Sequence, residues 1–160
     1  MALAPRPRPR STDPADYQRV PRPVAAMAKD FPAGHRIVPH SHERAQLIFA
    51  AHGAMLIATR EGSWAVPPQR ALWMPGGVTH EIRMAGDVAM RTLYVRGDAA
   101  ARLAPTVRVL AVSPLLRELI LRARAVLSRV ASPCRSDATM TARTAWTEGN
   151  RTALIGWAEA

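Results

Sequence analysis

The sequence predicts an all-β barrel or sandwich followed by one α-helix. Short apolar runs recur between residues 31 and 112, turn-forming residues separate them, and no helical period interrupts them. We count eight predicted strands, the number that a jelly roll needs. They span His35–Val38, Arg44–Ala50, Ala54–Thr59, Ser63–Val66, Ala71–Met74, Glu81–Met84, Val88–Val95 and Val107–Val112.

Residues 1–30 form a proline- and arginine-rich arm. Proline and arginine alternate from Pro5 to Arg10, and three further prolines follow by residue 23. Proline fixes φ and removes a backbone donor, so this composition favours extended, weakly ordered backbone. We therefore predict a poorly ordered tail. The alternative is an arm that folds over a pocket or reaches a partner.

One amphipathic helix is predicted over residues 113–130, directly after the barrel. The Ser113 hydroxyl can accept a hydrogen bond from an amide of the first turn, and Pro114 suits the first helical position. The apolar residues that share one face are Leu115, Leu116, Leu119, Ile120, Ala123 and Leu127. Such a face packs either on the sheet of its own chain or on the same helix of another subunit. Residues 131–160 lack a sustained period and are predicted to form a poorly ordered tail.

The composition restricts the class of protein. The single cysteine, Cys134, excludes an internal disulfide and a cysteine-based metal site. The N-terminus has no apolar core of signal-peptide length, and no apolar run approaches the roughly 20 residues of a membrane helix. We therefore predict a cytoplasmic protein without membrane contact.

The net charge of +10 is not concentrated in one region of the chain. It divides into +3 for residues 1–30, +4 for residues 31–112 and +3 for residues 113–160. Of the 22 basic residues, 21 are arginine, and Lys29 is the one lysine. A charge spread this evenly gives a general bias towards anions, so direct DNA binding by this chain is the less favoured interpretation.

Histidines and one glutamine form the pattern that points to a site. Four of the five histidines lie between residues 34 and 53. On a strand, His40 and His42 would point to the same face with Cα atoms roughly 7 Å apart, and Gln46 shares their parity. His80 follows a turn-forming Pro-Gly-Gly segment. Three convergent imidazoles and an amide predict either a metal site or the floor of a metal-free pocket that hydrogen-bonds a ligand.

The spacing around these residues resembles the two sequence motifs of the cupin superfamily. The first motif is matched at Gly34, His40, His42, Gln46 and Gly53, with Gln46 in place of the usual acid. The second is matched at Pro75, Gly77 and His80, whereas Gln69 and Met84 depart from it. The resemblance implies a single cupin domain, a jelly-roll barrel also described as a double-stranded β-helix, over residues 31–112.

Longer stretches resemble the N-terminal sensing and dimerisation domain of AraC-type transcription regulators. They read HSHERAQL, VPPQRALWMPGGVTHEIRM and VSPLLRELILRA, within residues 34–125. In that family a cupin barrel binds a small effector or mediates dimerisation, and a following helix-turn-helix part binds DNA. One helix and the 30 weakly patterned residues at 131–160 cannot supply that part. We expect the chain to lack it, as a truncated or frame-shifted regulator or as a stand-alone sensing domain.

The resemblance also implies a metal-ligand set. It assigns His40, His42, Gln46 and His80 as ligands of a divalent transition metal, and imidazole suits zinc, nickel, iron or copper. Gln46 is the weakest of the four, because a neutral amide leaves the charge of a divalent ion uncompensated. The alternative is that the histidines hydrogen-bond an effector without a metal.

Two tryptophans in predicted strands are assigned to the ligand pocket together with these four residues. Trp64 and Trp73 would each contribute an apolar wall to a binding site. Packing in the hydrophobic core is the alternative for both.

Two classes of function remain. The preferred one is a homodimeric sensing domain that binds a small-molecule effector without turnover, and we assign no catalytic residue. The alternative is a small metal-dependent cupin enzyme, an isomerase or a dioxygenase. Glutamate at position 46 and asparagine at position 84 would favour the enzyme, so Gln46 and Met84 favour the sensor.

Overall fold

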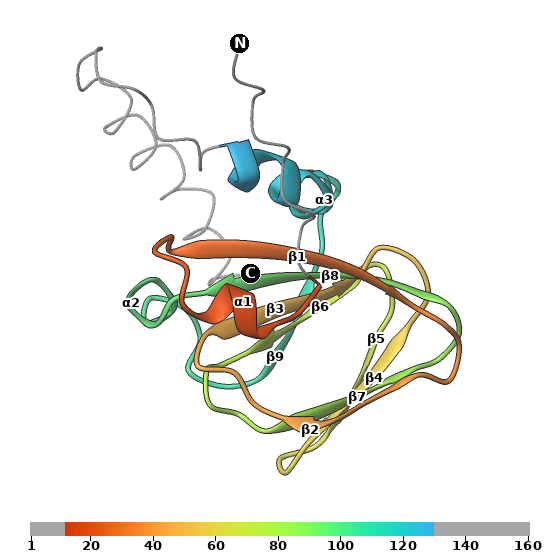
Figure 1. Ribbon diagram of the computed structural model, residues 1–160. Helices are drawn as coiled ribbons and strands as arrows, with labels where there is room; N and C mark the ends of the chain where they lie inside the picture. The colour runs from red at the N-terminus through yellow and green to blue at the C-terminus, as the bar shows by residue number, and fades with distance from the viewer. Residues whose placement is uncertain (1–11, 130–160) are drawn as a thin grey trace, which may run out of the picture.

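The computed structural model describes residues 12–129, which form two antiparallel sheets that face each other (Figure 1). One sheet has the strand order β1-β8-β3-β6-β9 and the other β2-β7-β4-β5. The strands are β1 (Val24–Phe31), β2 (Arg36–His40), β3 (Ala45–Ala50), β4 (Met55–Thr59), β5 (Ser63–Val66), β6 (Arg70–Met74), β7 (His80–Met84), β8 (Val88–Val95) and β9 (Arg108–Ala111). The helices are α1 (Ala15–Gln18), α2 (Gly97–Ala100) and α3 (Pro114–Arg129). The predicted all-β fold with a C-terminal helix is confirmed.

All eight predicted strands are present, with ends that differ from the prediction by two residues or fewer. Strand β1 was not predicted and lies inside the segment assigned to the arm. This strand pairs along its whole length with β8, from Val24 opposite Val95 to Phe31 opposite Val88. The barrel therefore begins at Val24 and not at residue 31. Residues 1–11 of the predicted arm and the predicted tail at 131–160 lie outside the described residues.

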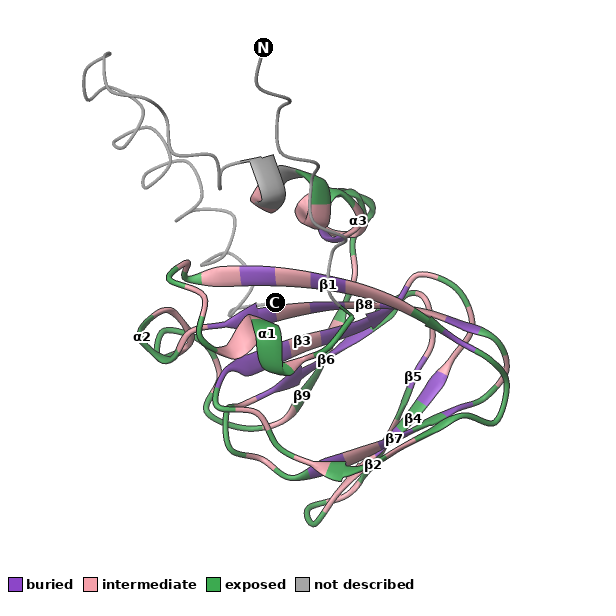
Figure 2. Ribbon diagram, in the orientation of Figure 1, coloured by how far each residue is buried: buried purple, intermediate pink, exposed green. Residues whose placement is uncertain are grey.

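The hydrophobic core fills the space between the sheets, and strands of both sheets carry the buried segments that are purple in Figure 2. Ile48 of β3, Ile57 of β4 and Leu72 of β6 are fully buried there. Alternation places the intervening residues on the outside, so that Leu56 of β4 is half exposed. Each buried aliphatic side chain contributes about 1.5–3 kcal/mol through removal of apolar surface from water.

Helix α3 covers the outer face of the five-stranded sheet (Figure 1). The Leu116 amide donates to the Ser113 hydroxyl at 3.2 Å, which confirms the predicted N-terminal cap. Ile120 is 3% exposed and packs on Phe49 of β3 and Ala71 of β6. The helix thus packs on its own sheet, the first of the two predicted arrangements.

Only part of the predicted apolar face of α3 contacts the barrel. Leu115 is 69% exposed and Leu119 is 59% exposed, on the side away from the sheet. None of the helices in the described part of the chain is long and apolar enough to cross a membrane.

Replacing Ile120 by alanine should lower the free energy of unfolding by about 2–5 kcal/mol, because it leaves a cavity over Phe49 and Ala71. The matched control, Leu119→Ala on the exposed side of the same helix, should change it by no more than about 0.5 kcal/mol. Urea unfolding of both variants measures the difference. Equal losses for the two variants would contradict the described packing of α3.

Candidate metal and ligand site

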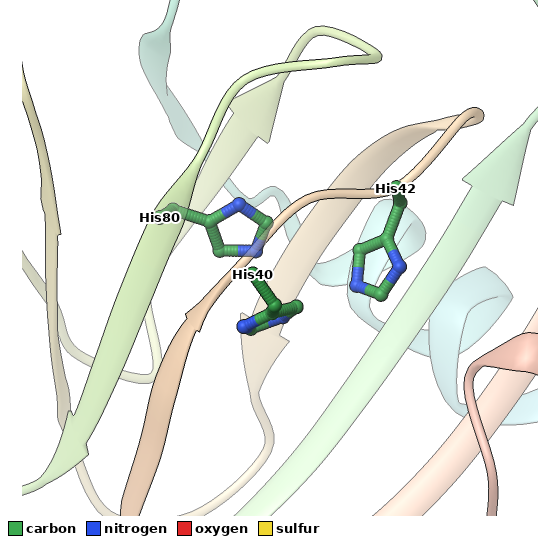
Figure 3. Close-up of side chains that lie close together, drawn as sticks. All are labelled: His40, His42 and His80. Carbon is green, nitrogen blue, oxygen red and sulfur yellow. The ribbon is translucent and has the colours of Figure 1, made fainter.

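Three histidines meet at one end of the space between the sheets (Figure 3). His40 ends β2, His42 lies in the following loop, and His80 begins β7. One ring nitrogen of each lies within 4.8 Å of the others, and the ring centroids of His40 and His80 are 4.4 Å apart. The structure therefore brings the three predicted histidines together. It differs from the prediction in one respect, because His42 reaches the group from a loop and not from the same strand face as His40.

A contact between two loops holds the histidines in this arrangement. The amide of Gly77 donates to the carbonyl of His42 at 2.8 Å, which joins the turn before His80 to the loop that carries His42. A Cβ on Gly76 would lie 2.4 Å from the carbonyl oxygen of Glu43, so only glycine permits this approach. Gly77 has φ +82°, a conformation that glycine adopts without strain.

Backbone carbonyls set the orientation of two of the imidazoles. The Nδ1 of His40 lies 2.7 Å from the carbonyl of Val38, and that of His80 lies 2.9 Å from the carbonyl of Val78. A carbonyl can only accept, so Nδ1 carries the proton and the lone pair is on Nε2 in both rings. The Nε2 of His80 is buried and has no hydrogen-bond partner within the described part of the chain. A buried lone pair without a partner fits a metal ion or a ligand proton.

Burial favours the neutral form of the His42 and His80 imidazoles. It lowers the pKa of His42 to about 4, and the neighbouring charges of His40 and His80 act in the same direction. Burial also lowers the pKa of His80, although the hydrogen bond to Val78 opposes the change. A metal binds the unprotonated form of imidazole, so near pH 7 both side chains are in the state that coordination requires.

A cavity of about 290 Å³ opens beside the histidines, between the two sheets. His40, His42 and Gln46 line it, whereas most of its wall is apolar. Gln46 lies on β3 opposite Tyr94 of β8, and both side chains face inward. The structure thus assigns Gln46 to the same cavity as two of the histidines.

Polar atoms in the cavity wall lack partners. The Gln46 Oε1, the Thr92 Oγ1 and the Tyr94 hydroxyl are buried without a hydrogen-bond partner among residues 12–129. Burial raises the pKa of Tyr94, so its hydroxyl keeps its proton and can donate. An unsatisfied buried polar group costs about 1–3 kcal/mol. Three such groups facing one cavity are available for hydrogen bonds to water or to a ligand.

The N-terminal segment closes over this cavity. Thr12 and Pro14 line it, and the ring of Tyr17 in α1 stacks on that of Tyr94 with centroids 5.7 Å apart. The segment at residues 12–22 therefore takes the second arrangement considered for the arm, folded over a pocket.

Arg44 holds that segment in place. Its side chain is 3% exposed and donates to the carbonyls of Gln18 and Arg22, both at 2.9 Å, and to that of Val20. The Arg44 amide also donates to the Gln18 side chain at 3.1 Å. One buried guanidinium thus satisfies three backbone acceptors of the N-terminal segment.

The two tryptophans assigned to the ligand pocket do not line the cavity. Trp73 alternates with the inward-facing Leu72 and Met74, so it lies on the outer face of β6, where its Nε1 donates to the Ala104 carbonyl at 2.7 Å. Trp64 packs against the core cluster between the sheets. The structure separates both tryptophans from the predicted ligand-binding set, and both take the alternative role of core packing.

Several residues of the cavity were not among the predicted site residues. Lys29, Thr92 and Tyr94 are examples that line it. Their parity was available as a signal. Lys29 points to the same face of its strand as Met27 and Phe31, and Thr92 points to the same face as Tyr94. The parity of Lys29 carries information only once β1 is known to be a strand, and β1 was not predicted.

The family model for AraC-like ligand binding domains matches residues 28–141. The chain belongs to this family. Among curated proteins, the HTH-type transcriptional regulator NimR of Escherichia coli strain K12 is 40% identical over 82 residues. The match covers 51% of this chain and 30% of that relative, so the chain spans less than a third of the relative's length.

Similar solved structures include two low-identity neighbours. A cupin-2 domain protein from Shewanella frigidimarina is 16% identical, with 46% of this chain and 72% of that chain covered and a TM-score of 0.41. The protein YhaK from Escherichia coli is 14% identical, with 58% and 45% covered and a TM-score of 0.46.

Removing the Arg44 guanidinium should release the N-terminal segment. In Arg44→Met, trypsin should cleave after Arg19 at least about tenfold faster than in the wild type, because three carbonyls lose their donor and local opening costs less free energy. Mass spectrometry of timed digests measures the rate. Arg83→Met, which removes an exposed cation of β7, should cleave at the wild-type rate. Slow cleavage in both variants would contradict the role of Arg44.

The stability of the metal-free protein should fall as the pH falls from about 6.5 towards 4. Burial lowers the pKa of His42 to about 4 in the folded protein, and in the unfolded chain the pKa has its ordinary value of 6.5, so in this window only the unfolded state binds the proton. The slope is less than about 1.4 kcal/mol per pH unit, because the half-buried ring is screened by solvent. Urea unfolding in EDTA at pH 7, 6 and 5 measures it. His42→Gln should reduce the dependence of the free energy of unfolding on pH. An unchanged dependence would contradict the lowered pKa of His42.

Proposed function

We propose that this domain is the effector-sensing part of an AraC-type transcription regulator and that the cavity between the sheets holds a small molecule. The observation that carries the proposal is the group of unpartnered buried atoms, on Gln46, Thr92 and Tyr94, which face a cavity closed by the N-terminal segment. Membership in the family of AraC-like ligand-binding domains supports it. On this proposal the protein acts in the cytoplasm, and DNA binding belongs to a separate helix-turn-helix part.

Dimerisation is part of the proposal. Leu115 and Leu119 lie on the side of α3 away from the sheet and are more than half exposed. Burial of such side chains against a second copy would remove apolar surface from water. The proposed assembly is a homodimer in which this side of α3 contributes to the interface.

A divalent metal would be held by His40, His42 and His80, with Gln46 as a fourth donor. The fixed tautomers of His40 and His80 and the unpartnered Nε2 of His80 support this assignment. Zinc, nickel, iron or copper suits such donors. A bound ion would supply a Lewis-acid centre for an oxygen of the effector, while the side chains orient it and the N-terminal segment excludes water.

The cavity wall favours sensing over the isomerase or dioxygenase alternative. No aspartate or glutamate is among the described residues that line the cavity, and Gln46 occupies the position of the acidic ligand in the first cupin motif. Aspartate and glutamate are common acids and bases for proton transfer in enzymes. A wall without either suits a ligand that is held and released unchanged.

Metal analysis of the purified full chain tests the metal assignment. After EDTA treatment and incubation with zinc or nickel, the wild type should retain about one ion per chain, measured by mass spectrometry of the metal, and its Tm should rise. His80→Ala and His42→Ala should retain none. His52→Ala, in the turn after β3, should behave as the wild type. Wild type without bound ion, or His42→Ala and His80→Ala with full occupancy, would contradict the assignment.

Thermal-shift measurements with a set of small sugars, organic acids and amides test the sensing function. A compound at 100 times its Kd adds about 2.7 kcal/mol to the free energy of unfolding and raises Tm. The expected shift should shrink in Gln46→Leu, which removes one unpartnered acceptor of the cavity. If no compound in the set raised Tm, the sensing proposal would fail.

A further inference from the structure

The cavity contains the one lysine of the chain. In β1 the inward-facing residues are Ala25, Met27, Lys29 and Phe31, and three of these four side chains are apolar. Lys29 lines the cavity and its ammonium lies 5.1 Å from the centroid of the Phe31 ring. This cation–π contact is worth about 0.5–1 kcal/mol at an exposed site and does not replace a counter-ion.

Lys29 makes no hydrogen bond or ion pair with the residues that the structure describes. The carboxylate next to it in sequence, Asp30, points to the other face of β1 and pairs with Arg91 at 2.8 Å. The carboxylates of Glu81 and Asp98 pair with Arg36 and Arg96. The ammonium inside the barrel is therefore left without an anion.

The charges around the cavity have one sign. Its lining includes Lys29 and Arg36 and no aspartate or glutamate. Arg36 is exposed and bonds to Glu81 at 3.2 Å, so Lys29 carries the uncompensated charge. Asp13, near the cavity mouth, is exposed and accepts a hydrogen bond from the Ala15 amide. A concave site with an uncompensated positive charge and mostly apolar walls attracts an anion more strongly than the open protein surface does.

A buried hydroxyl lies on the same side of the cavity. Lys29 is opposite Met90 in the pairing of β1 with β8, and Thr92 is opposite Met27. Lys29 and Thr92 are therefore diagonal neighbours on the inner face, roughly 7–8 Å apart at the backbone and within reach of a long side chain. The Thr92 hydroxyl has no partner and can donate. An ammonium and a hydroxyl together match the two oxygens of a carboxylate.

We infer that Lys29 and Thr92 bind the carboxylate of a small organic acid inside the barrel, and that Lys29 selects this anionic effector over its neutral analogue. The inference rests on the proposed function, in which the same cavity holds the effector. The apolar side chains of Met27, Ile48 and Ile82, which also line the cavity, contact the rest of the molecule.

Pairs of acids and their amides test the charge preference. The full chain is titrated with acetate, pyruvate, succinate and benzoate and with acetamide, pyruvamide, succinamide and benzamide, by thermal shift and calorimetry. At least one acid should bind at least about tenfold more tightly than its amide, since a hydrogen bond to a charged group contributes about 1.5–3 kcal/mol. If every amide bound as tightly as its acid, the inference would be overturned and the sensing function would stand. If neither acids nor amides bound, the inference would fail, and the sensing function would depend on the sugars of the wider set.

Variants at the two positions test the residues. Lys29→Met and Lys29→Gln should weaken the acid at least about tenfold and leave the amide unchanged, Lys29→Arg should retain most of the affinity, and Thr92→Val should weaken the acid. Arg60→Gln removes the same charge from an exposed turn and should bind as the wild type. The Tm of each free variant shows whether it folds, and the two uncharged replacements guard against one failing to fold. If Lys29→Met or Lys29→Gln folded and bound the acid with undiminished affinity, the inference would be overturned.

Discussion

The contact between the turn at Pro75–Gly77 and the loop at His42–Glu43 is the constraint on which the site depends. His80, which is distant in sequence from His40 and His42, can share a metal or a ligand with them only if these two loops keep one relative position. The hydrogen bond from Gly77 to His42 fixes that position, and the missing side chain of Gly76 lets the two backbones approach. Gly76 and Gly77, in the turn before His80, therefore place His80 against the loop that carries His42.

Much of the barrel could be predicted because its strands follow simple alternation and its turns use glycine and proline. The strands Ser63–Val66 and Val88–Val95 have the predicted bounds. The missed strand β1 has alanine at three of its six apolar positions and follows a proline-rich segment, so local propensity opposed the assignment. Its pairing with β8, a segment more than fifty residues away in the chain, supplies the stability that the local sequence lacks.

The site was predictable in its members and less so in its geometry. Parity on one strand predicted that His40 and His42 lie together. In the structure the strand ends at His40, and the following loop places His42 beside it. For Trp73, alternation separates the residue from its neighbours, yet the sequence does not say which face is inside until the sheets are packed. Arg44 gave no signal at all, because the partners of its guanidinium are backbone carbonyls rather than acidic side chains.

The orientation of His40 and His80 has a consequence for how this site changes over generations. Each ring is held by the carbonyl two residues before it, on Val38 and Val78, and a carbonyl is supplied by every amino acid. Substitutions at positions 38 and 78 can therefore accumulate without turning the imidazoles, as long as the backbone keeps its path. The hydrogen bonds that aim the rings are inherited with the fold and not with any particular side chain.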